Sequence, residues 1–251
     1  MDAQIKEWAE RIAAAAGAGR SFCIRGGGTK DFYGQPPSGE ALATNAWRGI
    51  VSYEPTELVV TARAGTPLAE LETALREKGQ CLPFEPPHFG AGATVGGMVA
   101  AGLSGPRRSA VGAVRDYVLG VKMLDGKGEL LAFGGQVMKN VAGYDVPRLM
   151  AGSLGTLGLL TEVSLKVLPL PMAGMTLRFA MGESEALKKL NEWGGKPLPV
   201  AASVWHDGAL TLRLAGAVAA VRAARQTLGG EEVGDAGAFW QSIREQTHPY
   251  F

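Results

Sequence analysis

Histidine and cysteine are both scarce in this chain of 251 residues. The three histidines, His88, His206 and His248, are scattered and lack the short spacing that a protein metal site needs. The two cysteines, Cys23 and Cys81, lie in apolar segments without a partner motif, so we expect reduced thiols of a cytoplasmic protein. The sequence therefore predicts neither a metal site nor a disulfide framework.

An excess of charge of one sign is also lacking, because 25 Lys and Arg stand against 24 Asp and Glu. A nearly neutral chain argues against nucleic acid or an anionic membrane surface as a partner. The most apolar window, VGGMVAAGL at 95–103, is too short and too rich in glycine to span a bilayer. We therefore expect no transmembrane segment.

Glycine is abundant: the chain has 36, about twice the usual share of ~7%. Many of them gather in three loops, RGGGTK at 25–30, GAGATVGGMVAAGLSG at 90–105 and GSLGTLG at 152–158. A Rossmann fingerprint would place its third glycine at Asp31, and the segment that follows cannot form the required helix. A phosphate-loop NTPase would need Gly-Lys followed by Ser or Thr, which neither GGGTK nor DGKGE supplies.

The first loop can instead turn successive backbone amides toward an anion. Arg25 and Lys30 add positive charge, and Thr29 adds a hydroxyl donor. A plain turn at a strand end would explain a single GGG as well. We expect Thr94 to cap a short helix beginning at Val95, whose amides would form a second anion site. Three such loops favour one long ligand with a pyrophosphate over three unrelated turns.

The pattern of short strands and helices along the chain predicts an α+β protein with two domains. Up to about residue 171, short strands and helices alternate around the glycine loops, and Asp125-Gly126 is expected to turn a hairpin. Residues 172–251 predict a smaller α+β domain that we expect to be truncated. The aromatic tail at 239–251 is expected to be disordered or buried against another chain, with a short helix packed on the second domain as the alternative.

The order of the motifs resembles a known family. RGGGTK, ATVGGMVAAGLSGPRR, VRDYVLGVKMLDGKGELLAFGG and MKNVAGYDVPRLMAGSLGTLGLLTEVSLKVLP follow one another as in the vanillyl-alcohol-oxidase (PCMH) type of FAD-binding domain. Within this type, the chain resembles the FAD-binding subunits of bacterial glycolate oxidases. The resemblance covers nearly all of residues 1–171 and implies a two-lobed FAD-binding domain, followed by a partial cap-like domain.

The resemblance also implies which residues hold FAD. The first loop would cradle the pyrophosphate, the second would follow the pyrophosphate and the ribityl chain, 103–112 would pass the isoalloxazine, and the third would receive the adenine end. Thr29 stands where some relatives carry a histidine bonded to the flavin, so FAD is expected to be non-covalent. The implied residues are Arg25, Gly26, Gly27, Gly28, Thr29, Lys30, Thr94, Val95, Gly96, Gly97, Leu103, Ser104, Ser109, Gly112, Gly155, Thr156, Gly158, Leu160 and Thr161.

Candidates for catalysis are few. His88 could act as a base, Arg107 could hold a substrate carboxylate, and Tyr144 could act as an acid; loop packing or solvation would explain each of them as well. Lys139 and Asn140 could pin a loop at the flavin. The family's T-N-A-G-G pattern is altered here at 101–105, and its metal-binding histidine cluster and closing C-terminal segment are missing from this sequence.

By resemblance, the chain is expected to be a subunit of a glycolate oxidase complex, which oxidises glycolate to glyoxylate through a flavin. The implied partners are a sister flavin subunit, an iron–sulfur subunit and a small 2-hydroxyacid substrate. The complex would be cytoplasmic, with a peripheral place at the inner membrane left open. Two alternatives remain: a stand-alone FAD-dependent D-2-hydroxyacid (D-lactate) dehydrogenase, and a non-catalytic scaffold subunit.

Overall fold

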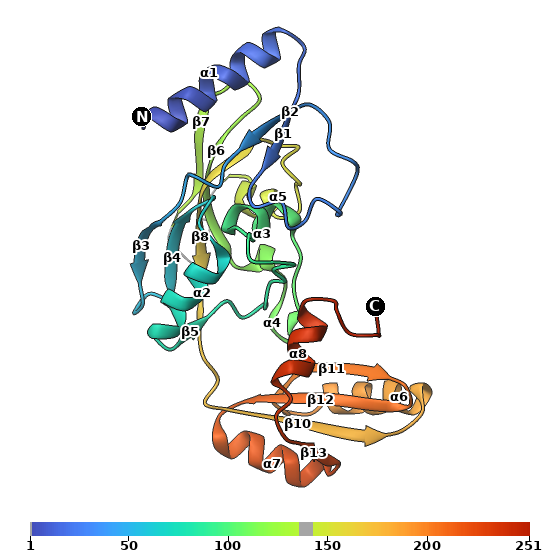
Figure 1. The fold of residues 1–251 in the computed structure, drawn as a ribbon. Helices are drawn as coiled ribbons and strands as arrows, with labels where there is room; N and C mark the ends of the chain where they lie inside the picture. Colours follow the sequence, from blue (N-terminus) through green and yellow to red (C-terminus); the bar gives the residue numbers. More distant parts are fainter. Residues whose placement is uncertain (1, 136–142) are drawn as a thin grey trace. The chain divides into compact units, whose positions relative to one another are not determined.

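A computed structural model describes residues 2–135 and 143–251, and the chain divides into two compact units (Figure 1). The first unit holds the chain up to Leu82, Pro86–Leu103 and Ala113–Leu168. The second holds Pro83–Glu85, Ser104–Gly112 and Pro169–Phe251. The expected boundary at residue 171 lies close to Leu168, but two short segments from the expected first domain pack with the second unit.

The elements of the first unit mix helices and strands, as expected. Its helices are α1 (Ala3–Gly17), α2 (Leu68–Glu77), α3 (Val95–Ala101), α5 (Val146–Met150) and the 3-10 turn η1 (Val114–Asp116). Its strands are β1 (Phe22–Arg25), β2 (Glu40–Ala43), β3 (Ile50–Glu54), β4 (Val59–Arg63), β5 (Gln80–Cys81), β6 (Val118–Leu124), β7 (Leu130–Gly134) and β8 (Leu159–Lys166), and β9 (Leu168–Pro169) follows at the boundary. Among the described residues, no helix combines the length and apolar character needed to cross a membrane.

The main sheet of the first unit has the order β3-β4-β8-β6-β7, with antiparallel neighbours throughout. Its central strand β8 is buried on both faces, and its buried positions include Thr161 and Ser164 as well as apolar side chains. The expected hairpin between β6 and β7 is confirmed. Asp125 closes its turn by accepting the amides of Lys127 at 2.8 Å and Glu129 at 2.9 Å, and these bonds lower the pKa of Asp125.

A cluster of aromatic side chains fixes the parallel pair β1 and β2 to the unit. The apolar face of α1 supplies Trp8, whose ring meets that of Trp47 edge to face at 6.3 Å. Trp47 donates its Nε1–H to the carbonyl of Thr161 at 3.0 Å, while Leu42 of β2 is buried in the same cluster. The C-terminal end of β1, where the first glycine loop begins, is therefore held in a fixed position.

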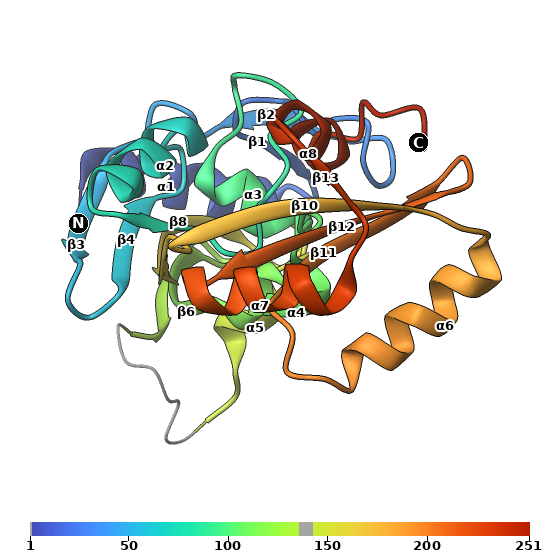
Figure 2. The same ribbon diagram turned by 90° about the horizontal axis from the view of Figure 1, so that it is seen from below.

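The second unit is a four-stranded antiparallel sheet with helices on both faces. Its strands are β10 (Ala173–Ala180), β11 (Val200–His206), β12 (Ala209–Gly216) and β13 (Glu231–Val233), in the order β11-β12-β10-β13. Its helices are α4 (Arg108–Val111), α6 (Glu183–Gly194), α7 (Val218–Leu228) and α8 (Gly237–Arg244). Helices α6 and α7 lie on one face of the sheet and α8 lies on the other (Figure 2).

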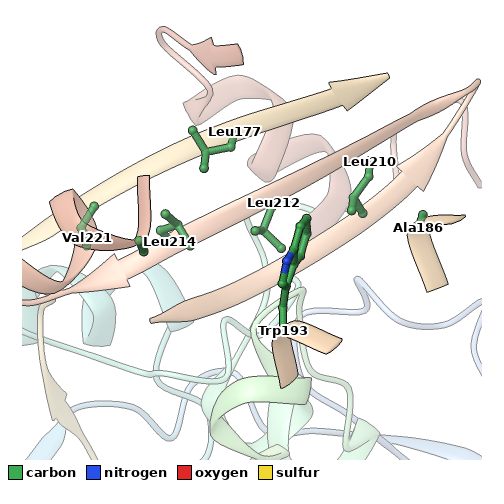
Figure 3. Close-up of a cluster of buried hydrophobic side chains, with 8 residues drawn as sticks. Leu177, Ala186, Trp193, Leu210, Leu212, Leu214 and Val221 are labelled. Atoms are coloured by element: carbon green, nitrogen blue, oxygen red, sulfur yellow. The ribbon is translucent and has the colours of Figure 1, made fainter. Parts of the chain in front are cut away.

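The core of the second unit follows the two-residue alternation of its strands. Leu210, Leu212 and Leu214 of β12 point to one face, where they meet Trp193 of α6 and Val221 of α7 (Figure 3). The residues between these leucines point to the opposite face, which α8 covers.

The aromatic tail is better ordered than expected. Trp240 of α8 is buried and donates its Nε1–H to Thr176 Oγ1 at 2.9 Å, while the guanidinium of Arg213 lies 4.6 Å from its ring centroid. The expectation of disorder or burial by another chain is therefore wrong for α8. The alternative, a short helix packed on the second domain, describes it, because Trp240 packs against the sheet of its own unit. The rings of Tyr250 and Phe251 remain exposed.

We predict that Trp240→Ala lowers the free energy of unfolding by about 3 kcal/mol, since a buried indole and its hydrogen bond are both lost. Trp240→Phe keeps most of the packing and should cost only about 1 kcal/mol. The control Tyr250→Ala removes an exposed ring and should stay within about 0.5 kcal/mol of the parent. Urea denaturation measures all three. Equal stability of Trp240→Ala and Tyr250→Ala would contradict the packing of α8.

Candidate dinucleotide-binding site

A cavity of about 450 Å³ lies within the first unit, where the three glycine loops meet β1. This volume is in the range of small-molecule sites in proteins, roughly 300–1,000 Å³. The first and third loops are more than 100 positions apart in the sequence, so only the fold brings them together. The residues expected to hold FAD that line the cavity are Arg25, Gly26, Gly27, Gly28, Thr29, Lys30, Thr94, Gly96, Gly97, Gly155, Thr156, Gly158 and Leu160.

The first loop offers a row of backbone donors. Within the described part of the chain, the amides of Gly26, Gly27, Gly28 and Thr29 donate no hydrogen bond. Gly28 has a φ of 73°, a left-handed conformation that other residues rarely adopt. Successive unpaired amides around such a residue are typical of an anion-binding concavity. The loop is partly open to solvent, so an anion can displace water from it.

The charges beside this loop differ from the expectation. Arg25 forms an ion pair with Asp31, and hydrogen bonding to this carboxylate raises the pKa of the guanidinium. Lys30 donates its Nζ–H to Thr29 Oγ1 at 3.4 Å and to the carbonyl of His88 at 3.2 Å. Asp31, which the sequence did not single out, also lines the cavity and offsets one of the two expected cations.

The amides at the start of α3 do not form the expected second anion site. Thr94 caps the helix as predicted, accepting the amide of Gly97 at 3.1 Å. However, the amide of Val95 donates to the carbonyl of Thr66 at 2.9 Å, and the amide of Gly96 donates to that of Ala64 at 2.7 Å. These donors are already used within the protein, so the expectation of an anion site at this helix end is wrong.

Helix α3 instead presents a face of small residues to the cavity. Gly96, Gly97, Ala100 and Ala101 line the cavity, whereas Met98 and its apolar neighbours point into the core. A Cβ at Gly96 would lie 2.6 Å from the Cβ of Ala64, so this helix position tolerates no side chain. The small residues leave room for a ligand to run along the helix.

Two of the loops also pack directly on each other. A Cβ at Gly27 would overlap the backbone carbonyl of Gly92, and a Cβ at Gly26 would lie 2.5 Å from Thr94 Oγ1. Glycine is therefore needed at both positions for the loops to meet, independently of any ligand. This packing fixes the row of amides relative to α3.

The third loop is strongly bent. Gly152, Leu154, Gly155 and Gly158 all have positive φ values between 51° and 143°. Within the described residues, the amides of Gly155 and Gly158 donate no hydrogen bond, so they stay available to a ligand. Thr156 serves the loop itself, because its amide and hydroxyl both donate to the carbonyl of Ser153, at 2.9 and 2.7 Å.

Ser153 is among the cavity residues that the sequence reasoning missed. Ser153 lines the cavity and is only 9% exposed, yet its Oγ has no hydrogen-bond partner in the described part of the chain. A buried hydroxyl without a partner costs about 1–3 kcal/mol. Unpaired amides, an unpaired hydroxyl and a smooth helix face together fit a long polar ligand with a phosphate at its centre.

Several expected FAD-binding residues lie elsewhere. Val95 is fully buried in the core, and Thr161 donates its hydroxyl to the carbonyl of Lys122 at 3.0 Å, so neither side chain lines the cavity. Their expected backbone contacts with FAD stay predictions. Leu103 is half-buried outside the lining. The second unit contains Ser104, Ser109 and Gly112, whose roles at the isoalloxazine stay predictions.

None of the catalytic candidates within the described residues lines this cavity. His88 Nε2 lies 3.1 Å from Glu72 Oε2 on α2, so its ring joins a loop to a helix and does not face the cavity. Tyr144 is 94% exposed, which leaves no support for a role as an acid at the flavin. Arg107 precedes α4 in the second unit, and its role as a carboxylate ligand stays a prediction.

Lys139 and Asn140 lie outside the described residues.

A cavity built from loop amides, with glycines where backbones meet, defines a domain that binds a dinucleotide mainly through its main chain. The model of the FAD binding domain family matches residues 3–134, just over half of the chain. The chain belongs to this family. FAD as the cofactor is therefore confirmed, whereas its non-covalent attachment stays a prediction.

Relatives of known function support the assignment. The chain is 55% identical to glycolate oxidase subunit GlcE of Escherichia coli over 228 residues, covering 91% of this chain and 65% of that protein. It is 34% identical to glycolate oxidase subunit GlcD of Bacillus subtilis, covering 61% of this chain and 33% of that protein. A D-lactate dehydrogenase of Archaeoglobus fulgidus is 33% identical, and the match covers 71% of this chain and 40% of that protein. The chain thus spans about two thirds or less of these relatives.

Solved structures support the fold class. A crystal structure of alkyldihydroxyacetonephosphate synthase superposes with a TM-score of 0.72 at 16% identity, covering 95% of this chain and 52% of that one. At this level of identity the similarity concerns the fold alone. The expected α+β fold of the PCMH-type FAD-binding proteins is confirmed.

We predict that Gly27→Ala lowers the free energy of unfolding of the apoprotein by about 2 kcal/mol and abolishes FAD retention, because the added Cβ overlaps the backbone at Gly92. The control Gly126→Ala sits in the β6–β7 turn, where an added Cβ meets nothing within 4 Å. Thermal melting and the flavin absorbance that survives gel filtration measure both effects. A Gly27→Ala protein with parental stability and flavin content would refute the loop packing.

Proposed function

We propose that this chain is the FAD-binding subunit of a glycolate oxidase complex. The observation that carries the proposal is its 55% identity to Escherichia coli glycolate oxidase subunit GlcE over 91% of the chain. A cavity with free loop amides supports FAD binding by the chain itself. The reaction would convert glycolate to glyoxylate.

Oxidation of glycolate removes a hydride from the substrate carbon and a proton from its hydroxyl. Bound FAD supplies an acceptor for the hydride from the carbon, and a base must take the hydroxyl proton. The residues of this chain would hold and orient the dinucleotide. The charged side chains that line the cavity already bond within the protein: Arg25 pairs with Asp31, and Lys30 donates to Thr29 Oγ1 and to the carbonyl of His88.

We therefore assign to this subunit an FAD with a relay or structural role, and leave substrate oxidation to the assembled complex. The similarity to GlcD, also named a glycolate oxidase subunit, supports a sister flavin subunit as a partner. An iron–sulfur subunit would carry electrons away from the flavins. A small 2-hydroxyacid is the substrate of the complex as a whole.

Two other functions are separated from this one by simple experiments. A stand-alone D-2-hydroxyacid dehydrogenase is favoured by the 33% identity to a D-lactate dehydrogenase, although the chain covers only 40% of that protein. It would turn over D-lactate or glycolate without partners. A scaffold subunit would assemble with its partners while remaining colourless.

We predict that FAD binds non-covalently and protects Cys23 from alkylation. Cys23 lines the cavity, whereas Cys81, which is also half-buried, does not, so it provides an internal control. Acid treatment should release all flavin into the supernatant. Adding FAD back should then slow the reaction of iodoacetamide with Cys23 and leave that of Cys81 unchanged, as peptide mass spectrometry can show. Flavin retained in the precipitate, or equal protection of both thiols, would contradict this prediction.

We predict that the chain alone shows no glycolate-dependent dye reduction, and that the complex with the sister flavin and iron–sulfur subunits does. Ala100→Trp provides a matched variant, because Ala100 is half-buried on the cavity face of α3 and a larger side chain would fill the ligand space. The variant should lose FAD and most of the turnover of the complex. Substrate oxidation by the isolated chain would point to the stand-alone dehydrogenase.

A further inference from the structure

Ser153 is held in place by its own backbone and by the residues on both sides of it. Its amide donates to the carbonyl of Met150 at 3.2 Å, and its carbonyl accepts from Thr156. The flanking amides of Gly152 and Leu154 donate to carbonyls of α3, those of Val99 at 3.0 Å and Ala100 at 2.9 Å. The backbone that carries the Ser153 side chain is therefore held rigidly at the cavity wall.

The hydroxyl of Ser153 differs from the other buried hydroxyls around the cavity. Thr94 Oγ1 accepts the amide of Gly97, and Thr44 Oγ1 donates to the carbonyl of Arg25 at 3.3 Å. Ser153 Oγ is shielded from solvent and has no such partner in the described chain. Because an unpaired buried hydroxyl destabilises the protein, alanine would suit the empty fold better.

We infer that Ser153 is a cofactor-binding residue whose hydroxyl forms a hydrogen bond with the bound dinucleotide. This inference rests on the proposed binding of FAD in the cavity. A serine side chain turns among three staggered rotamers, and its hydroxyl can donate or accept. Such a rotation brings Oγ to a ligand in the cavity without any movement of the backbone.

The position of Ser153 also indicates which part of the ligand it contacts. The row of amides at 26–29 lies beside Thr94, at the start of α3, whereas Ser153 lies beside Ala100, near its end. Six residues of helix separate these two points by roughly 9 Å. With the pyrophosphate on the amides, the hydroxyl of Ser153 reaches a sugar hydroxyl or a base atom and not the same phosphates.

The test compares Ser153→Ala with Ser164→Ala in acid-stripped, reloaded protein. Ser164 is also 9% exposed, but its Oγ lies 2.8 Å from Thr61 Oγ1 in the main sheet, outside the cavity lining. Ser153→Ala should weaken FAD binding by about tenfold and leave the melting temperature of the apoprotein equal or higher. Ser164→Ala should lower that melting temperature and leave the affinity unchanged. Quenching of flavin fluorescence measures affinity.

ADP serves as a second probe. A loss of ADP affinity in Ser153→Ala that matches the loss for FAD would place the contact in the adenosine half, and an unchanged ADP affinity would place it in the flavin half. Parental protein that binds no FAD would overturn the proposed function itself. Parental FAD affinity in Ser153→Ala, or a fall in its apoprotein stability like that of Ser164→Ala, would overturn the role of Ser153 alone.

Discussion

The direct contact between two backbones, at Gly27 and Gly92, is the constraint on which the site depends. Any side chain at Gly27 would occupy the space of the Gly92 carbonyl, so the first loop reaches α3 only because glycine is present. This contact fixes the unpaired amides of 26–29 beside Thr94 and the small-residue face of α3. Phosphate binding at these residues is a prediction, and it would rely on main-chain donors more than on net side-chain charge, which Asp31 reduces.

The charged side chains that line the cavity already bond within the protein, Arg25 with Asp31 and Lys30 with Thr29 and His88. A wall of glycine, alanine and loop amides can approach a dinucleotide closely, but it supplies no proton acceptor. His88, a candidate for catalysis, has another role in the first unit, because its ring pairs with Glu72 and its carbonyl accepts from Lys30. This division agrees with a subunit that holds a flavin for a larger assembly.

The second unit is built on a different principle, side-chain packing across a sheet. Leucines of β12 fill one face against α6 and α7, and Trp240 closes the other face through its bond to Thr176. On that second face Arg213 contacts the ring of Trp240 and pairs with Glu85 at 2.5 Å, a residue from far earlier in the chain. Segment 83–85 is therefore part of this unit although the sequence places it in the middle of the first.

The sequence by itself determined the features that depend on local chemistry. The Asp125-Gly126 turn and the Thr94 cap were predicted correctly, because neighbouring residues decide turns and caps. The order of the motifs predicted the fold class and FAD through its resemblance to a known family. Only the tertiary structure decided which polar groups remain available. The amides of α3 are used by Thr66 and Ala64, and the hydroxyl of Thr161 by Lys122, whereas that of Ser153 stays unpaired. Whether such a group is bonded depends on partners distant in sequence, which a local sequence pattern cannot predict.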